Sequence, residues 1–325
     1  MNLKQSILAT LTYHDIFNYP LTESEICSYL IGNRSSLARV QNGIRGLVRE
    51  KRIGKNRELY FLNKRKNLPV VRLKRQKFSR DKLKKAAFFA TVLKLIPSIE
   101  LVAISGALSM ENSTKGDDID FVIITSENTL WQTRFLANLI LLPYKRSPNS
   151  KIQKDKACLN IFLDKKALKI TGKNLYTAHE ICQMKPIWDR NNTYQKFLKS
   201  NNWTKMYLPN WEPTYKSIPK ASKRKSDYRN KPSVFENMAK KVQLRYMESK
   251  ITTEKIGDKQ LFFHPLDTEK KVLTVFRKKI AKLDKISGRE YNSRHGFKRK
   301  THRAQKIFAT NGAREAKSPE SNRKS

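Results

Sequence analysis

The stretch Ile104–Thr125, ISGALSMENSTKGDDIDFVIIT, decides the fold of the chain. One apolar run ends in a Ser-Gly-Ala turn, and another begins directly after Asp118. Because side chains alternate along a strand, Asp118 and Asp120 fall on one face while Ile119 points into the core. Two adjacent carboxylates repel each other, and a cation beside them relieves that cost. The stretch therefore predicts two strands, with a cation site where the second strand begins.

The residue types in this stretch suit a phosphate as well as a cation. Backbone N–H groups at Ser105, Gly106 and Ala107 can approach a phosphate closely, because the side chains there are small. Carboxylate oxygens are hard ligands, which favours Mg²⁺ or Mn²⁺ at Asp118 and Asp120. The pattern thus places a phosphate-binding turn ahead of a divalent-cation site.

Small residues at a strand end, followed by Asp-x-Asp leading an apolar strand, resemble the signature of the DNA polymerase beta-type nucleotidyltransferase superfamily. Further stretches, among them YHDIFNYPLTESEI, CLNIFL, NLYTAHEICQMKPI and SNNWTKMYLPN, resemble a bacterial group that joins an N-terminal winged helix to such a domain. The resemblance runs from about residue 6 to residue 285. Only the motif around Asp118 and Asp120 implies a catalytic activity.

The resemblance implies an enzyme that transfers a nucleoside monophosphate from an NTP to an acceptor hydroxyl, with release of pyrophosphate. It assigns the metal, Mg²⁺ or Mn²⁺, to Asp118 and Asp120. It assigns the triphosphate to Ser105, Gly106 and Ala107. The acceptor stays open between a nucleic acid, a protein and a small molecule.

Two positions depart from the family's pattern. Ala107 replaces the usual serine, which removes one hydroxyl contact to phosphate. Asn160, in CLNIFL, stands where the family's third catalytic carboxylate is expected, and an amide cannot serve as a general base. Either Asn160 is a weak ligand, or Asp164 or Glu180 substitutes for the carboxylate, or turnover is poor. The alternative function is a catalytically impaired nucleic-acid-binding or regulatory protein that keeps the transferase fold.

Residues 1–63 predict a winged helix-turn-helix, with three helices closed by a hairpin. Thr22 and Glu25 form a capping box that opens the second helix, and Ser36 can cap the third. The hairpin is expected to turn at Gly-Lys-Asn, residues 54–56. The third helix has an apolar face made by Leu37, Val40, Ile44, Leu47 and Val48. Its other face carries Arg39, Gln41, Asn42, Arg45 and Arg49. Such a face is expected of a helix that reads a nucleic-acid groove, of a protein-interaction module or of an ordinary solvated helix.

The rest of the chain predicts an α+β protein. A basic linker, residues 64–80, leads to a nucleotidyltransferase domain at 81–185, a helical region at 186–288 and a disordered basic tail at 289–325. The domain is expected to hold a small mixed sheet covered on one side by helices. Its expected elements are helices at 81–96 and 130–142, and strands at 100–105, 119–125 and 157–163.

Positive charge is extreme and clustered. Of the net charge of +40, three segments (64–85, 216–245 and 289–325) hold +10, +8 and +8. Clustered Lys and Arg suggest contact with a polyanion, because each cation near a phosphate releases a condensed counterion. Nucleic acid is therefore an expected partner, and a generally lysine-rich composition is the alternative explanation.

The cysteines and apolar runs predict a cytoplasmic protein. Cys27, Cys158 and Cys182 are widely spaced and lack metal-ligand spacing, which favours reduced thiols. No secretory apolar segment follows MNLKQS. The longest apolar run, FLANLILLP, is too short to span a bilayer, so no membrane contact is expected.

Overall fold

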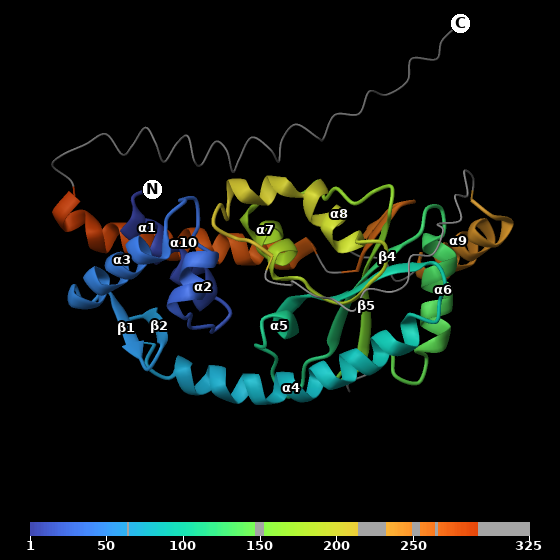
Figure 1. The fold of residues 1–325 in the computed structure, drawn as a ribbon, viewed down its shortest axis with the longest axis horizontal. Helices are drawn as coiled ribbons and strands as arrows, with labels where there is room; N and C mark the ends of the chain where they lie inside the picture. The colour runs from blue at the N-terminus through green and yellow to red at the C-terminus, as the bar shows by residue number, and fades with distance from the viewer. Residues whose placement is uncertain (64, 147–152, 214–231, 249–253, 264–265, 292–325) are drawn as a thin grey trace, which may run out of the picture.

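The computed structural model shows an α+β protein (Figure 1). Across the residues it describes, ten α-helices accompany a six-stranded mixed sheet and a two-stranded hairpin. In the same part of the chain, no helix is both long and apolar enough to cross a membrane. The described residues are 1–63, 65–146, 153–213, 232–248, 254–263 and 266–291.

The N-terminal unit consists of three helices and a hairpin. Its elements are α1 (Leu3–Asp15), α2 (Glu23–Ser28), α3 (Leu37–Arg49), β1 (Ile53–Asn56) and β2 (Leu59–Leu62). The capping box predicted for α2 is confirmed: Thr22 Oγ1 accepts from the Glu25 N–H at 3.2 Å, and Glu25 Oε2 accepts from the Thr22 N–H at 2.8 Å. The apolar face of α3 is buried at Val40, Ile44 and Leu47, whereas Leu37 in its first turn is 44% exposed.

The turn of the hairpin lies two to three residues later than predicted. Asn56 pairs with Leu59, so Arg57 and Glu58 form the turn, and Arg57 adopts φ 52°. Gly54 lies in β1, opposite Phe61. A Cβ at Gly54 would lie 2.5 Å from the Phe61 ring, so the glycine serves close packing and not the turn.

The segment predicted as a basic linker is helical from Leu68 onward. It forms the first half of α4 (Leu68–Leu93), which runs along the molecule from the N-terminal unit to the sheet (Figure 1). Arg72 is buried in this helix; it pairs with Glu25 at 2.7 Å and lies over the Tyr19 ring at 4.4 Å. Basic side chains therefore fasten α4 to the N-terminal unit.

The six-stranded sheet has the order β6-β3-β4-β5-β8-β7. Neighbouring β4 and β5 are parallel, and the other pairs are antiparallel. The strands are β3 (Ile99–Ile104), β4 (Ile119–Thr125), β5 (Ala157–Asp164), β6 (Lys185–Asp189), β7 (Lys255–Ile256) and β8 (Gln260–Phe262). The three strands predicted from the sequence are confirmed to within one residue at each end. The last three were missed, and β7 and β8 interrupt a region predicted to be helical.

Helices cover both faces of the sheet, so the prediction of a single covered face is wrong. Phe121 and Ile123 of β4 point to the face packed by α4, α6 (Leu130–Ile140) and α9 (Val234–Met247). Val122 and Ile124 point to the opposite face, where α7 (Leu175–Gln183) and α8 (Thr193–Ser200) pack. The alternation of β4 thereby supplies two separate cores.

The remaining helices are α5 (Gly106–Ser109), the 3₁₀ helix η1 (Asn202–Met206) and α10 (Leu266–Tyr291). Helix α10 contacts both α1 and α7, and so joins the N-terminal unit to the sheet (Figure 1). Residues 292–325, almost all of the predicted disordered tail, lie outside the described residues, as do residues 216–231 of the second basic segment.

Candidate functional site

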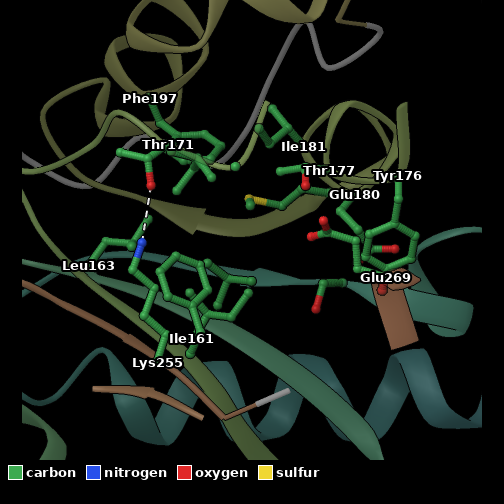
Figure 2. Close-up of a pocket in the computed structure, with 16 residues that line it drawn as sticks. Ile161, Leu163, Thr171, Tyr176, Thr177, Glu180, Ile181, Phe197, Lys255 and Glu269 are labelled. Atoms are coloured by element: carbon green, nitrogen blue, oxygen red, sulfur yellow. Dashed lines mark hydrogen bonds between the residues drawn. The ribbon is translucent and has the colours of Figure 1, made fainter. Parts of the chain in front are cut away.

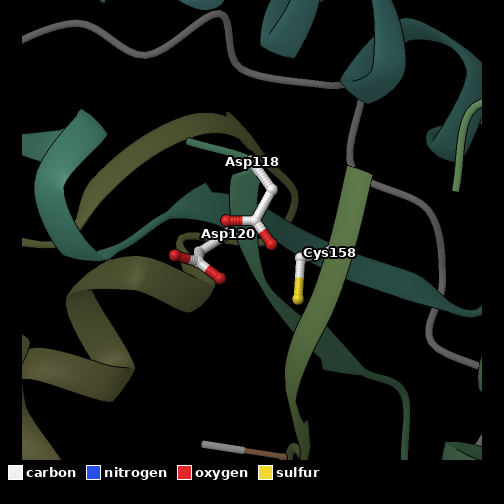
Figure 3. A group of neighbouring side chains, drawn as sticks. All are labelled: Asp118, Asp120 and Cys158. Atoms are coloured by element: carbon white, nitrogen blue, oxygen red, sulfur yellow. The ribbon is translucent and has the colours of Figure 1, made fainter. Parts of the chain in front are cut away.

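Asp118 and Asp120 lie at the start of β4, on the sheet face that α7 covers (Figure 3). Strand β5 runs parallel beside them, with Cys158 opposite Asp120 in the register. Both aspartates are partly buried. The position of this site at one end of two neighbouring strands follows from the parallel pairing.

The Ser-Gly-Ala turn lies directly against Asp120. The Ser105 N–H donates to the Asp120 carbonyl at 3.1 Å. Gly106 adopts φ +63°, and a Cβ there would lie 3.2 Å from Asp120 Oδ2, so glycine suits both the backbone and the space. Ser105 is 3% exposed, and its Oγ has no hydrogen-bond partner within the described residues. Ala107 is exposed on α5.

A buried lysine holds the loop that precedes β4. Lys82 of α4 is 2% exposed; it donates to the Asp117 carbonyl and pairs with Asp155 at 2.7 Å. The Asp117 carboxylate accepts from the Thr114 N–H at 2.8 Å, which closes a local turn. A residue counted from the sequence as part of a basic cluster thus positions the loop that carries Asp118.

Asn160 reaches the site from a bulge in β5. Phe121 pairs with Leu159 and Val122 pairs with Ile161, which leaves Asn160 as the extra residue. Its side chain is buried, and Nδ2 donates to Asp120 Oδ1 at 3.2 Å. In this arrangement the amide of Asn160 contacts the second aspartate and supplies no third carboxylate.

Sequence reasoning missed two members of the site. Ligand atoms of Asp118, Asp120 and Cys158 all lie within 4.8 Å of one another. Arg146, which follows α6, pairs through Nη1 with Asp118 Oδ2 at 2.8 Å. Strand alternation in CLNIFL could have placed Cys158 on the same face as Asn160, whereas no sequence pattern pointed to Arg146.

Burial and mutual repulsion shape the electrostatics of the site. Burial, followed by the charge of Asp118, raises the pKa of Asp120 to about 7. Burial, followed by the charge of Asp120, also raises the pKa of the Cys158 thiol. The site therefore keeps a neutral thiol beside a carboxylate whose pKa lies near neutral pH, and which nearby positive charge would favour in its ionised form.

The donor set fits a hard divalent cation in part. Two carboxylates from one strand offer the oxygen ligands that Mg²⁺ and Mn²⁺ prefer. The three ligand atoms lie within 4.8 Å of one another, whereas two oxygens bound to one Mg²⁺ are at most about 4.2 Å apart, so the carboxylates would move slightly to share an ion. A neutral thiol is a poor ligand for such an ion, so Asp118 and Asp120 fit the metal and Cys158 does not.

Of the two other acidic candidates, Asp164 lies away from this site and Glu180 lies near it. Asp164 is at the far end of β5, opposite Thr125, where it accepts from the Asn128 N–H at 2.7 Å. The structure therefore does not bring Asp164 to Asp118 and Asp120. Glu180 of α7 lies within electrostatic range of Asp120: burial, followed by the charge of Asp120, raises the pKa of Glu180 to about 7.

His179, next to Glu180, points away from the site. It is fully buried and stacks on Tyr13 of α1, with ring centroids 3.8 Å apart. The ring of His14 approaches it edge-on at 5.3 Å. Burial lowers the pKa of both histidines, to about 4 for His14. These side chains join the N-terminal unit to α7 and take no part in the site around Asp120.

Comparison of the chain with protein-family models, with curated proteins and with solved structures finds no match.

Proposed function

We propose that the chain is a Mg²⁺-dependent nucleotidyltransferase that transfers a nucleoside monophosphate from an NTP to an acceptor hydroxyl. The hydrogen bond from the Ser105 N–H to the Asp120 carbonyl, at 3.1 Å, carries the proposal. It joins a small-residue turn that suits a phosphate to the strand whose carboxylates suit a metal. Nucleotidyl transfer needs both features side by side.

Each residue of the site has a part in this proposal. Asp118 and Asp120 would hold the metal, which supplies charge neutralisation for the triphosphate when it is bound. The buried Ser105 hydroxyl offers an unused hydrogen bond at the turn. Arg146, 37% exposed, neutralises Asp118 and offers its other guanidinium donors to a phosphate. Gly106 leaves room for the Asp120 carboxylate.

A second candidate function is nucleic-acid binding or regulation by a protein with impaired catalysis. Two observations favour it: the side chain that bonds Asp120 from β5 is the amide of Asn160 and not a carboxylate, and α3 exposes Arg39, Asn42, Arg45 and Arg49. In this proposal the N-terminal unit is a winged helix that contacts nucleic acid through α3.

The first basic segment supports nucleic-acid binding less than its charge suggests. Five of its cations already form ion pairs or hydrogen bonds with other groups of the chain: Arg65, Arg72, Arg75, Lys82 and Lys85. Arg72 and Lys82 are also buried. The polyanion surface would therefore rest on the exposed remainder of α4, on α3 and on the other two basic segments.

Calorimetric titration of the full chain with NTP, in the presence and absence of Mg²⁺, tests the first proposal. The proposal expects Mg²⁺-dependent binding that Asp118→Asn and Asp120→Asn each abolish. Asp81→Asn, the same chemical change at an exposed position of α4, is the matched control. Equal affinity in the wild type and in the Asp118→Asn, Asp120→Asn double variant would remove the basis for a metal site here.

A further inference from the structure

A pocket of about 180 Å³ adjoins the Asp120 site, between the sheet and α7, α8 and α10 (Figure 2). Its walls are mainly apolar, and include Val122, Ile161, Leu163, Phe197 and Phe262. The volume is close to that of an engineered apolar cavity of roughly 150 Å³ that binds benzene. The pocket therefore suits a compact apolar group of about that size.

One end of this pocket is acidic. Glu180, Tyr176 and Glu269 gather there, while Lys255 bonds Thr171 at the opposite end (Figure 2). Glu269 accepts one hydrogen bond, from Asn174 at 2.8 Å. For Glu180 the described part of the chain provides neither a hydrogen bond nor an ion pair. Lys270 lies within electrostatic range of Glu269. In a chain of net charge +40, a carboxylate at an apolar pocket that has no ion pair among the described residues, as at Glu180, is unusual.

A second feature points to a ligand in the same place. The pocket reaches Ser105, whose hydroxyl is buried and has no partner among the described residues. A buried hydroxyl and a half-buried carboxylate that both lack partners lose hydrogen bonds that water would otherwise supply. A ligand in the pocket that carries donor groups would supply hydrogen bonds that both side chains lack.

We propose that the pocket binds a small organic cation, namely an amine with a compact apolar body, whose ammonium group pairs with Glu180 and Glu269. An anion would be repelled by the glutamates wherever they are ionised. A neutral apolar molecule would contact the apolar walls of the pocket but would leave the carboxylates without a cationic partner. An ammonium group offers three donors, enough to serve the two carboxylates and the Ser105 hydroxyl. The inference does not depend on nucleotidyl transfer, because it concerns binding without nucleotide.

Titration of the full chain without nucleotide or metal tests the proposal with three probes of matched shape. Phenethylamine is the cation, phenethyl alcohol its neutral counterpart and phenylacetate the anion. The amine should bind ten- to a hundredfold more tightly than the alcohol, as expected for a charge-assisted hydrogen bond, and phenylacetate should bind more weakly still. Equal affinity for the amine and the alcohol, or no amine binding at millimolar concentration, would overturn the proposal.

Variants then locate the site. Glu180→Gln keeps the shape of the side chain and should remove the preference for the amine, and Glu269→Gln should reduce it. Glu58→Gln, at an exposed position in the hairpin turn, is the control and should leave binding unchanged. If Glu180→Gln does not fold, Glu269→Gln provides the test by itself. Unchanged amine affinity in the folded Glu180→Gln or Glu269→Gln variant would contradict the assignment, and loss of NTP binding would not bear on it.

Discussion

Replacing Asp120 with asparagine should stabilise the metal-free protein at alkaline pH. The folded protein holds the pKa of Asp120 at about 7, against an ordinary value of 3.8, so the native state keeps a proton that the unfolded chain releases. The native state therefore binds more protons between these two values, and the free energy of unfolding falls as pH rises through this window. Asparagine is neutral throughout and escapes this loss.

The size of the effect follows from the same two pKa values. At about 1.36 kcal/mol for each pH unit, the upper limit is about 4 kcal/mol. The gain should be smaller, about 2 kcal/mol at pH 8, because Asp120 is partly exposed and its charged form accepts a hydrogen bond from Asn160. At pH 4 the wild type is almost fully protonated at Asp120, so the difference should nearly vanish.

Urea unfolding followed by tryptophan fluorescence, with EDTA present, measures the effect at pH 4, 6 and 8. Asp81→Asn reports any general response to losing a surface charge. With Mg²⁺ in place of EDTA at pH 8, the midpoint of the wild type should rise and that of Asp120→Asn should stay almost unchanged, because only the wild type keeps both ligands. The reasoning is refuted if Asp120→Asn is less stable than the wild type at pH 8, or if its gain does not depend on pH.

Three further predictions concern the third acidic position, the histidine contact and the positive charge. Asn160→Asp should place a carboxylate beside Asp120 and raise nucleotidyl transfer, measured as pyrophosphate release; lower activity in a folded variant would mean that the amide itself is needed. Burial lowers the pKa of His14 from 6.5 in the unfolded chain to about 4 in the folded protein. The unfolded chain therefore binds more protons between these pH values, and the free energy of unfolding should fall as pH falls from 6.5 to 4. His14→Gln should reduce that loss of unfolding free energy by up to about 3 kcal/mol, measured by urea unfolding. An unchanged pH dependence would exclude His14 as its source. Binding of a short nucleic acid, followed by fluorescence anisotropy, should weaken with salt at a log–log slope of roughly −0.7 to −0.9 per phosphate contacted. Deleting residues 289–325 should reduce that slope without changing NTP binding, while no binding at low salt would leave a generally lysine-rich composition as the explanation.

The sequence predicted those elements whose local signals agree with their packing. The Thr22 capping box gave the start of α2, and alternation around Asp120 gave β4 with its two faces. The first half of α4 was missed because its buried positions include Arg72 and Ser79, and Arg72 suggests a solvated charge until Glu25 is seen beside it. Strands β7 and β8 have two and three residues, too few for alternation to appear.

The same reasoning applies to the candidate site. Asp118 and Asp120 could be found because they are neighbours in one strand. The bulge at Asn160 could not be predicted, since it depends on how β5 pairs with β4. Cys158 lies before the bulge and reaches the aspartates through the same pairing of β4 with β5. Arg146 comes from a loop, and only the tertiary structure shows its contact with Asp118.

A crystal structure of the full chain with Mg²⁺ and a non-hydrolysable NTP analogue tests the central claim most directly. The account predicts a metal ion bound by Asp118 and Asp120, with the triphosphate against the backbone of Ser105 and Gly106. Nucleotide bound elsewhere, or a site in which Arg146 and Asp118 stay paired with no metal at saturating Mg²⁺ and analogue, would contradict it.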